Sequence, residues 1–189
     1  MKISLPVLET ERLILREINE YDAYDMYEYA HLPYVGPEAG WEPHTSLSYT
    51  REVISAYRRK KQYGQLGVFA VILKKEMKMI GTAELHSYTP DFKAELGYTI
   101  NPNYWGNGYA YEASRELIKW GFLNLNLKRI ECCAFVQNSK STSVCEKLQL
   151  TYEGIRRKAY QLYNGYIGDL KCYAITDDEF FERCKYNNW

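Results

Sequence analysis

The first third of the chain combines an alternating apolar pattern with two helical ones. Residues 12–16 alternate charged and apolar side chains, which is typical of an antiparallel strand with one face exposed. Asn19 provides a helix cap, and the following pattern predicts a helix over residues 20–32 that Pro33 ends. A loop rich in glycine and proline comes next, and a second helix is predicted over residues 46–63. Loops of this kind often overhang a binding cleft.

The remainder of the chain is dominated by β-rich runs, with two helices between them. The predicted elements are strands over 66–73, 77–88 and 92–100, a helix over 107–123, a strand over 129–136, a helix over 141–148, and two strands around Asn164–Gly165. The Asn-Gly dipeptide is a strong hairpin signal. This order predicts an α/β (α+β) fold with a mixed sheet and helices on both of its faces.

Length and charge narrow the class of protein further. The chain has 189 residues without repeat or linker, so we expect one domain over residues 1–189. Lys plus Arg and Asp plus Glu number 24 each, so no overall field attracts nucleic acid or an anionic membrane. The first six residues lack a signal-peptide pattern, and no apolar run approaches the ~20 residues of a membrane span. We therefore expect a cytoplasmic protein.

The cysteines do not indicate a metal site. There are five of them, and no pair has the two-residue gap of a zinc site. The sequence therefore predicts reduced, mostly buried thiols and no metal. Because none of the three histidines can be paired with a cysteine from the sequence, cysteine catalysis is not expected either.

The segment over residues 94–113 carries the clearest chemical signal. It is a strand, a loop with Gly106 and Gly108, and the start of a helix. Glycines without side chains let backbone N–H groups turn towards one point, and the helix start adds the positive end of its dipole. Such a loop suits a pyrophosphate. An ordinary tight turn is the alternative explanation.

This segment resembles the acetyl-CoA loop of the GNAT superfamily of N-acetyltransferases, which follows Gln/Arg-x-x-Gly-x-Gly/Ala. Asn103, Gly106 and Gly108 occupy the three positions, so the first departs from the pattern. The fuller string over residues 105–113 is similar to the RimJ/RimL-type branch, which acetylates the N-termini of ribosomal proteins. Residues 8–16 also resemble that branch, and so does the segment over 138–148 with its Asn-x-x-Ser pattern.

The resemblance implies a mostly antiparallel sheet of about seven strands, with a splay between the fourth strand (94–100) and the fifth (129–136). Acetyl-CoA would be the co-substrate, with its pantetheine arm paired to exposed backbone in the splay. Asn138 would bond the pantetheine amide, and Ser141 would lie near the thioester sulfur. The implied coenzyme-binding residues are Leu96, Tyr98, Thr99, Ile100, Asn103, Trp105, Gly106, Asn107, Gly108, Tyr109, Ala110, Asn138 and Ser141.

Direct transfer needs a base for the amine and an acid for the leaving thiolate. Glu95 is the first candidate base, because its Ala-Glu-Leu setting is similar to that of the catalytic Glu in histone-acetylating members. Glu84 is the second, because it shares a strand face with His86. Ser141 is the candidate acid. The alternatives are a solvated carboxylate at 95, a hydrogen-bonded patch at 84 and a helix cap at 141.

One further position affects the mechanism. The resemblance to RimL-like enzymes implies a catalytic Glu in the strand that follows a Leu-Glu-Gly motif. When this motif is aligned with residues 153–154, Tyr160 occupies the position of that Glu. By this alignment that base is missing.

The acceptor is left open by the sequence. The resemblance favours the N-terminal α-amine of a protein or peptide, a small amine such as an antibiotic, polyamine or amino acid is the close alternative, and a non-catalytic coenzyme-binding module is the third. Because relatives of this type are often dimers, the resemblance also favours a homodimer, with a Tyr-rich strand edge near the C-terminus as the contact.

Overall fold

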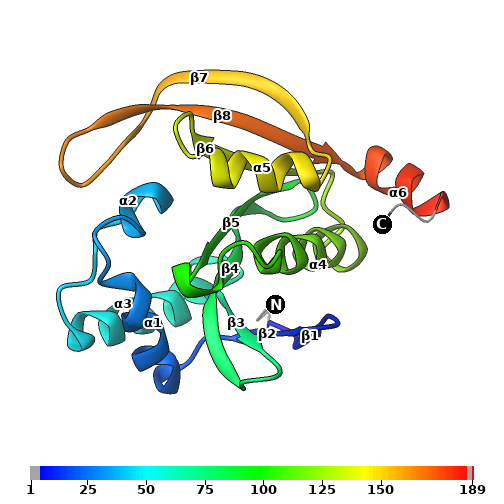
Figure 1. Cartoon of the computed structure of the whole chain (residues 1–189). Helices are drawn as coiled ribbons and strands as arrows, with labels where there is room; N and C mark the ends of the chain where they lie inside the picture. The colour runs from blue at the N-terminus through cyan, green and yellow to red at the C-terminus, as the bar shows by residue number, and fades with distance from the viewer. Residues whose placement is uncertain (1–4, 187–188) are drawn as a thin grey trace.

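The computed structural model describes residues 5–186 and 189. Residues 1–4, part of the stretch tested for a signal peptide, lie outside the described residues. The described chain forms one eight-stranded sheet in the order β1-β2-β3-β4-β5-β6-β8-β7 (Figure 1). Its strands are β1 (Leu8–Glu9), β2 (Leu13–Glu17), β3 (Phe69–Leu73), β4 (Lys78–Thr89), β5 (Lys93–Ile100), β6 (Arg129–Phe135), β7 (Thr151–Gln161) and β8 (Ile167–Thr176).

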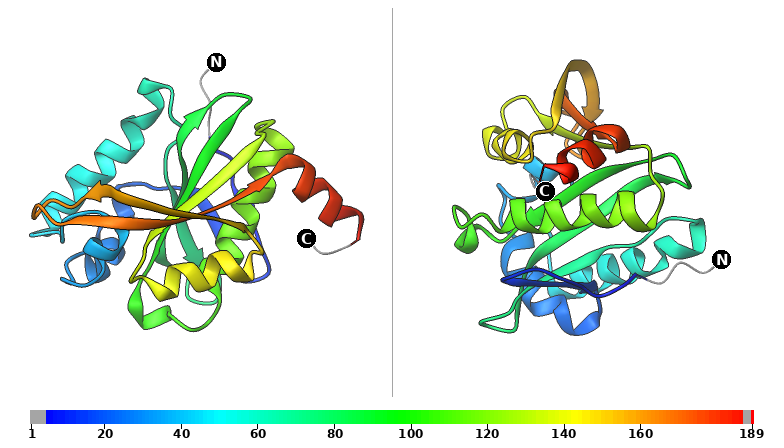
Figure 2. Two further views of the ribbon diagram at one scale, coloured as in Figure 1. Left: turned by 90° about the horizontal axis from the view of Figure 1, so that it is seen from above. Right: turned by 90° about the vertical axis from the view of Figure 1, so that its right-hand side faces the viewer.

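Helices lie on both faces of the sheet, as predicted (Figure 2). The α-helices are α1 (Ala23–Ala30), α2 (Gly36–Ala39), α3 (Leu47–Arg59), α4 (Tyr109–Asn124), α5 (Ser139–Lys147) and α6 (Asp177–Lys185), with short 3-10 turns at Glu20–Asp22, Lys60–Tyr63 and Pro102–Tyr104. The α4 and α5 helices pack on one face and α1 and α3 on the other.

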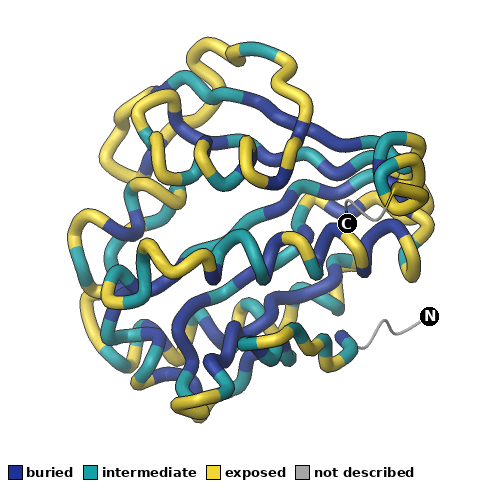
Figure 3. The backbone as a smooth tube through the Cα atoms, turned by 45° about the vertical axis from the view of Figure 1, so that its right-hand side comes forward, coloured by how far each residue is buried: buried dark blue, intermediate teal, exposed yellow. Residues whose placement is uncertain are grey.

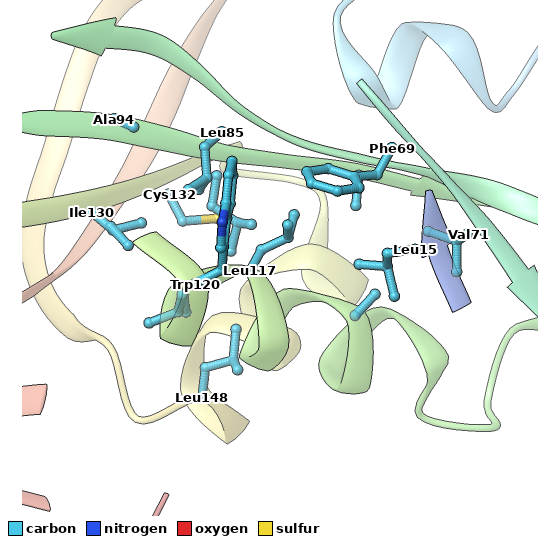
Figure 4. Close-up of a cluster of buried hydrophobic side chains, with 14 of the residues drawn as sticks. Leu15, Phe69, Val71, Leu85, Ala94, Leu117, Trp120, Ile130, Cys132 and Leu148 are labelled. Carbon is cyan, nitrogen blue, oxygen red and sulfur yellow. The ribbon is translucent and has the colours of Figure 1, made fainter. Parts of the chain in front are cut away.

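Alternation of side chains along the strands creates the two hydrophobic cores. In β3, Phe69 and Val71 face α4, and Ala70 and Ile72 face α1 and α3. All five residues of this strand are buried, as expected for a strand covered on both faces. Figure 3 shows that buried backbone lies mainly in the interior of the molecule and exposed backbone mainly in its outer turns. Trp120 of α4 packs edge-on against Phe69 in the larger core (Figure 4), and their ring centroids are 5.4 Å apart.

The predicted mostly antiparallel sheet is confirmed. Every adjacent pair of strands is antiparallel except β5 and β6, which are parallel. The hairpin around Asn164–Gly165 is also present and joins β7 to β8, with Gly165 at φ +85°.

Some element predictions need correction. The sheet has eight strands rather than about seven, because Leu8–Glu9 pairs with β2 as the short strand β1. The first predicted helix ends at Ala30, and the glycine- and proline-rich loop after it contains the short helix α2. Helix α4 begins at Tyr109 instead of residue 107, because Gly108 at φ +80° is its N-cap. Within the described residues, no helix is long and apolar enough to span a membrane.

Candidate active site

Strands β5 and β6 separate after three residue pairs, which opens the sheet. Their ladder pairs Lys93 with Arg129 and ends with Glu95 opposite Glu131. Beyond that point β5 continues to Ile100 and β6 to Phe135, with no further pair between the described residues of these two strands. The predicted splay is therefore present, and it leaves two facing strand edges available to an extended ligand.

One cavity of about 750 Å³ occupies the splay. The glycine loop, both open strands, the start of α5, β7 and the segment around α2 all contribute to its lining. The sequence-predicted residues that line it are Glu84, Glu95, Leu96, Tyr98, Thr99, Ile100, Trp105, Gly106, Gly108, Tyr109, Ala110, Asn138 and Ser141. Asn103 and Asn107 are not part of the lining. The Asn103 amide instead lies 3.4 Å from a Glu28 carboxylate oxygen.

The glycine loop has the geometry of an anion-binding turn. Gly106 and Gly108 both have positive φ, +79° and +80°, and a Cβ placed on Gly106 would meet nothing within 4 Å. Helix α4 begins directly after the loop, so its unpaired N–H groups and dipole lie at this end of the cavity. The Trp105 indole donates a 2.7 Å hydrogen bond to the Ile100 carbonyl, and the Lys140 ammonium lies 3.7 Å from the centre of its ring. Trp105 therefore ties the loop to the end of β5.

A hydrogen-bond network holds the glycine loop to the turn between β1 and β2. The sequence did not reveal this network. Arg12 donates a 2.9 Å hydrogen bond to the Asn107 carbonyl, and its guanidinium pairs with Glu112 at 2.6 Å. Thr10 donates to the same carboxylate. Burial would raise the pKa of Glu112, but the hydrogen bonds from Thr10 and Arg12 outweigh it and lower that pKa. Glu112 therefore stays ionised and holds Arg12 beside the loop.

We expect Arg12→Ala to raise the dissociation constant of coenzyme A about tenfold, the usual effect of losing a hydrogen bond to a charged group. The loop would lose the contact that orients Asn107. Calorimetry gives the dissociation constant and urea denaturation gives the loss of stability. Arg58→Ala on α3, where the arginine is paired with Glu20 at 3.5 Å, is the control. Unchanged coenzyme affinity in Arg12→Ala would show that the loop holds its shape without this network.

At the first turn of α5, Ser141 faces Tyr98 of β5. Their hydroxyl oxygens are 2.9 Å apart. Burial raises the pKa of Tyr98 well above its ordinary value, so this phenol stays protonated. Asn138 caps the helix by accepting a 3.0 Å hydrogen bond from the Ser141 N–H. Its amide donates to the Glu38 carbonyl at 3.2 Å, so both ends of the Asn138 side chain have protein partners.

The two candidate bases lie on the other side of the cavity, on the face that carries α1 and α3. Glu95 is opposite His86 and Glu84 is opposite Gly97, so both carboxylates point to the same face of neighbouring strands. Glu84 forms an ion pair with Lys60 at 2.5 Å. Glu95 is the last residue of β5 that pairs with β6, which places it at the apex of the splay.

Tyr160 also reaches this cavity. Its hydroxyl donates a 3.0 Å hydrogen bond to the Gly40 carbonyl, and its ring packs perpendicular to Phe135 with centroids 5.7 Å apart. The resemblance to RimL-like enzymes implies a catalytic glutamate at this position. In this chain the position is Tyr160, whose side chain holds the segment around α2. Within the described residues, no group of three or more His, Cys, Asp or Glu could hold a metal ion.

Comparison with known proteins identifies the family to which this geometry belongs. Residues 12–151 match the family described as acetyltransferase (GNAT) domain. The chain belongs to the GNAT family of acetyltransferases. It is 32% identical over 177 residues to the uncharacterized N-acetyltransferase p20 of Bacillus licheniformis, covering 93% of this chain and 99% of that relative.

Solved GNAT structures share the whole fold. The GNAT-family acetyltransferase of Bacillus anthracis superposes with a TM-score of 0.82 at 28% identity, over 92% of this chain and 100% of that one. The ribosomal-protein-S5-alanine acetyltransferase of Vibrio fischeri superposes with a TM-score of 0.75 at 26% identity, over 92% and 98%. These similarities confirm the resemblance to GNAT enzymes seen in the sequence, and they show that the chain is an N-acetyltransferase.

The cavity fits the acetyl donor that GNAT enzymes use, acetyl-CoA. The open edges of β5 and β6 suit its pantetheine arm, and the loop at Gly106 leaves space for a diphosphate beside the start of α4. Lys140 adds a cation next to that loop. When bound, the coenzyme supplies the activated acetyl group, and the protein supplies the groups that orient it and move protons.

Proposed function

We propose that this protein is a single-domain enzyme that moves an acetyl group from acetyl-CoA directly to a primary amine, the N-terminal α-amine of a protein or peptide. One observation carries the proposal: a single cavity has the glycine loop at one end and the carboxylates of Glu84 and Glu95 near the apex of the splay. An acetyl donor and an amine acceptor can thus meet within one cavity.

Glu95 is the proposed general base. An α-amine has an ordinary pKa of about 7.7–8.0, so much of it is protonated at pH 7 and must lose a proton before it attacks. Glu95 takes that proton directly or through a water molecule. Glu84 is the second candidate, although its ion pair with Lys60 already occupies one carboxylate oxygen. Backbone N–H groups on the open edge near Leu96 to Tyr98 are the proposed stabilisers of the developing oxyanion.

Ser141 is the proposed acid for the leaving thiolate. Because Tyr98 stays protonated, its hydroxyl can donate to Ser141 Oγ, which leaves the serine proton free to point into the cavity. Tyr98 thus orients the serine hydroxyl. The alternative, in which Ser141 only caps α5, is less well supported, because the capping acceptor of this helix is the Asn138 side chain.

Ser141→Ala is expected to lower kcat about 100-fold, the lower end of what acid–base groups contribute. The dissociation constant of coenzyme A should change little. The substitution keeps the backbone N–H of residue 141, which donates to the Asn138 side chain and so preserves the cap of α5. Stopped-time thiol-release assays and calorimetry measure the two quantities. Ser139→Ala, an exposed position in the same helix, is the control. Wild-type turnover in Ser141→Ala would leave this serine without a catalytic role.

The choice of a protein N-terminus is supported by the RimJ/RimL-type segments of the sequence and by the similarity to the S5-alanine acetyltransferase. The test is release of coenzyme thiol with a panel of peptides that carry free N-termini, the same peptides with blocked N-termini, and small amines. Turnover only with free N-termini supports the proposal. Turnover confined to polyamines, amino acids or aminoglycosides would replace it by small-molecule acetylation, and coenzyme binding without any turnover would contradict acetyl transfer.

Two expectations accompany this proposal. From the sequence pattern we expect a cytoplasmic location. We also expect a homodimer through the Tyr-rich outer strand β7, where Tyr152 is exposed. Size-exclusion chromatography with light scattering tests the second.

A further inference from the structure

The segment over residues 36–41, called here the strap, crosses from one side of the splay to the other. It follows α1 and contains α2, which lies between the α1–α3 pair and the β7–β8 hairpin (Figure 1). On the α1 side, Trp41 packs against the smaller core, and the His44 N–H donates to the Ala30 carbonyl at 2.9 Å. Across the splay, the strap is held by two hydrogen bonds to its own carbonyl groups, at Glu38 and Gly40.

The contact at Gly40 is built from several residues that fit one another. Gly40 has φ +90°, and a Cβ there would lie 2.9 Å from the Tyr160 hydroxyl oxygen. The Tyr160 ring rests edge-on against Phe135. Phe135 in turn occupies the space that a side chain on Gly168 would need, because a Cβ there would lie 2.7 Å from the Phe135 ring. Tyr160 is thus held in place from β6 and β8.

An irregularity in β7 brings Tyr160 to this position. The register of β7 with β8 shifts between Arg156 and Tyr160, and Lys158 within the shift has φ +48°. Its N–H donates a 2.7 Å hydrogen bond to the Asp169 side chain, which fixes the irregularity. Bulges of this kind redirect the side chains that follow them. The outer strand β7 is mostly exposed, but the side chain of Tyr160 lines the cavity.

We propose that Tyr160 is a positioning residue that fastens the strap over the acceptor side of the cavity, and that the fastened strap selects amines carried on a slender, extended chain end. The proposal rests on the proposed acetyl transfer. The cavity holds about 750 Å³ in all, and the thioester arm must share that space with the acceptor. Because Glu38, Gly40 and Trp41 of the strap are part of the lining, an acceptor with bulk around its amine has to displace them.

The chemistry of Tyr160 fits this role. In the structure its hydroxyl donates to a main-chain carbonyl of the strap, so its proton is already engaged. Trp41 and Tyr57 line the same cavity as Tyr160 and the two carboxylates, so aromatic side chains border the space beside Glu84 and Glu95. An N-terminal residue in extended conformation meets these limits, and a polycyclic amine does not.

The test compares Tyr160→Phe, which removes only the hydroxyl, with wild type and with Tyr163→Phe on the same hairpin. The first measurement is hydrogen exchange of the backbone amides of residues 36–41 in the free protein. We expect exchange at Gly40 and Trp41 to speed up about fivefold in Tyr160→Phe, the effect of one hydrogen bond between neutral groups. Gly40→Ala should also speed exchange, because its methyl group would meet the Tyr160 hydroxyl oxygen and because an L residue is strained at φ +90°.

The second measurement is steady-state acetylation of an alanyl tetrapeptide and of an aminoglycoside at saturating acetyl-CoA. In Tyr160→Phe the KM for the peptide should rise about fivefold with kcat and the pH profile unchanged, and the preference for the peptide over the bulky amine should fall by a similar factor. Tyr163→Phe should behave as wild type.

Unchanged amide exchange in Tyr160→Phe would overturn the proposal. A shifted pH–rate profile in that variant would also overturn it, because it would make Tyr160 a proton-transferring group. The exchange experiment needs no turnover. If no amine is acetylated but exchange in the strap rises as expected, the fastening role of Tyr160 stands and the proposed acetyl transfer is wrong.

Discussion

Replacing Glu95 by glutamine is expected to lower kcat at pH 7 by about 100-fold or more, since general bases contribute on that scale. Glutamine keeps the shape of the side chain at the apex of the splay but cannot take a proton from the amine. The deficit should shrink as the pH rises through about 8, because an α-amine then loses its proton to the solvent. Pre-steady-state and steady-state rates between pH 6 and pH 9 measure this dependence.

Glu84→Gln is the matched control, because Glu84 lies on the same face of the neighbouring strand and lines the same cavity. Its ion pair with Lys60 gives it a structural role, so a smaller loss of kcat and a pH profile like that of wild type are expected. Coenzyme affinity should be unaltered in both variants. A larger loss in Glu84→Gln with a flat response in Glu95→Gln would transfer the role of base to Glu84.

The second large effect is expected at the glycine loop. Gly106→Val should raise the dissociation constant of coenzyme A at least tenfold, because a left-handed backbone costs an L residue about 1–2 kcal/mol and a β-branched one more. The loop at φ +79° would relax towards another conformation, and its N–H groups would no longer point to one place. The new side chain would also enter space that is open in the structure. Calorimetric titration with coenzyme A checks this.

Gly165→Val separates backbone strain from loss of the binding site. Gly165 has φ +85° and, like Gly106, open space where a Cβ would be, but it lies in the β7–β8 turn outside the cavity. Both variants should lose similar stability in urea denaturation, and only Gly106→Val should lose coenzyme affinity. If coenzyme binds Gly106→Val as tightly as wild type, the loop is not the diphosphate site.

Local signals predicted those parts of the structure that depend on neighbours in the chain. Alternation at 12–16 and the helical stripe with Ala113 and Leu117 each report which side of an element is buried, and the structure buries those sides. The Asn-Gly dipeptide marks the position of a tight turn, and β7 and β8 pair around it. One available signal was missed. Thr176 and Glu179 form a capping box at the start of α6, a pattern that marks a helix N-terminus, yet this helix was not predicted.

By itself, the sequence determined the order of the main elements, the glycine loop before α4 and the family resemblance, because each is written in residues close together in the chain. Only the tertiary structure decided which distant side chains meet. Arg12 reaches Asn107 across 95 positions, and Tyr160 reaches Gly40 across 120. Such contacts depend on the strand order of the whole sheet and on the bulge in β7, and periodicities of two or 3.6 residues carry no information about either.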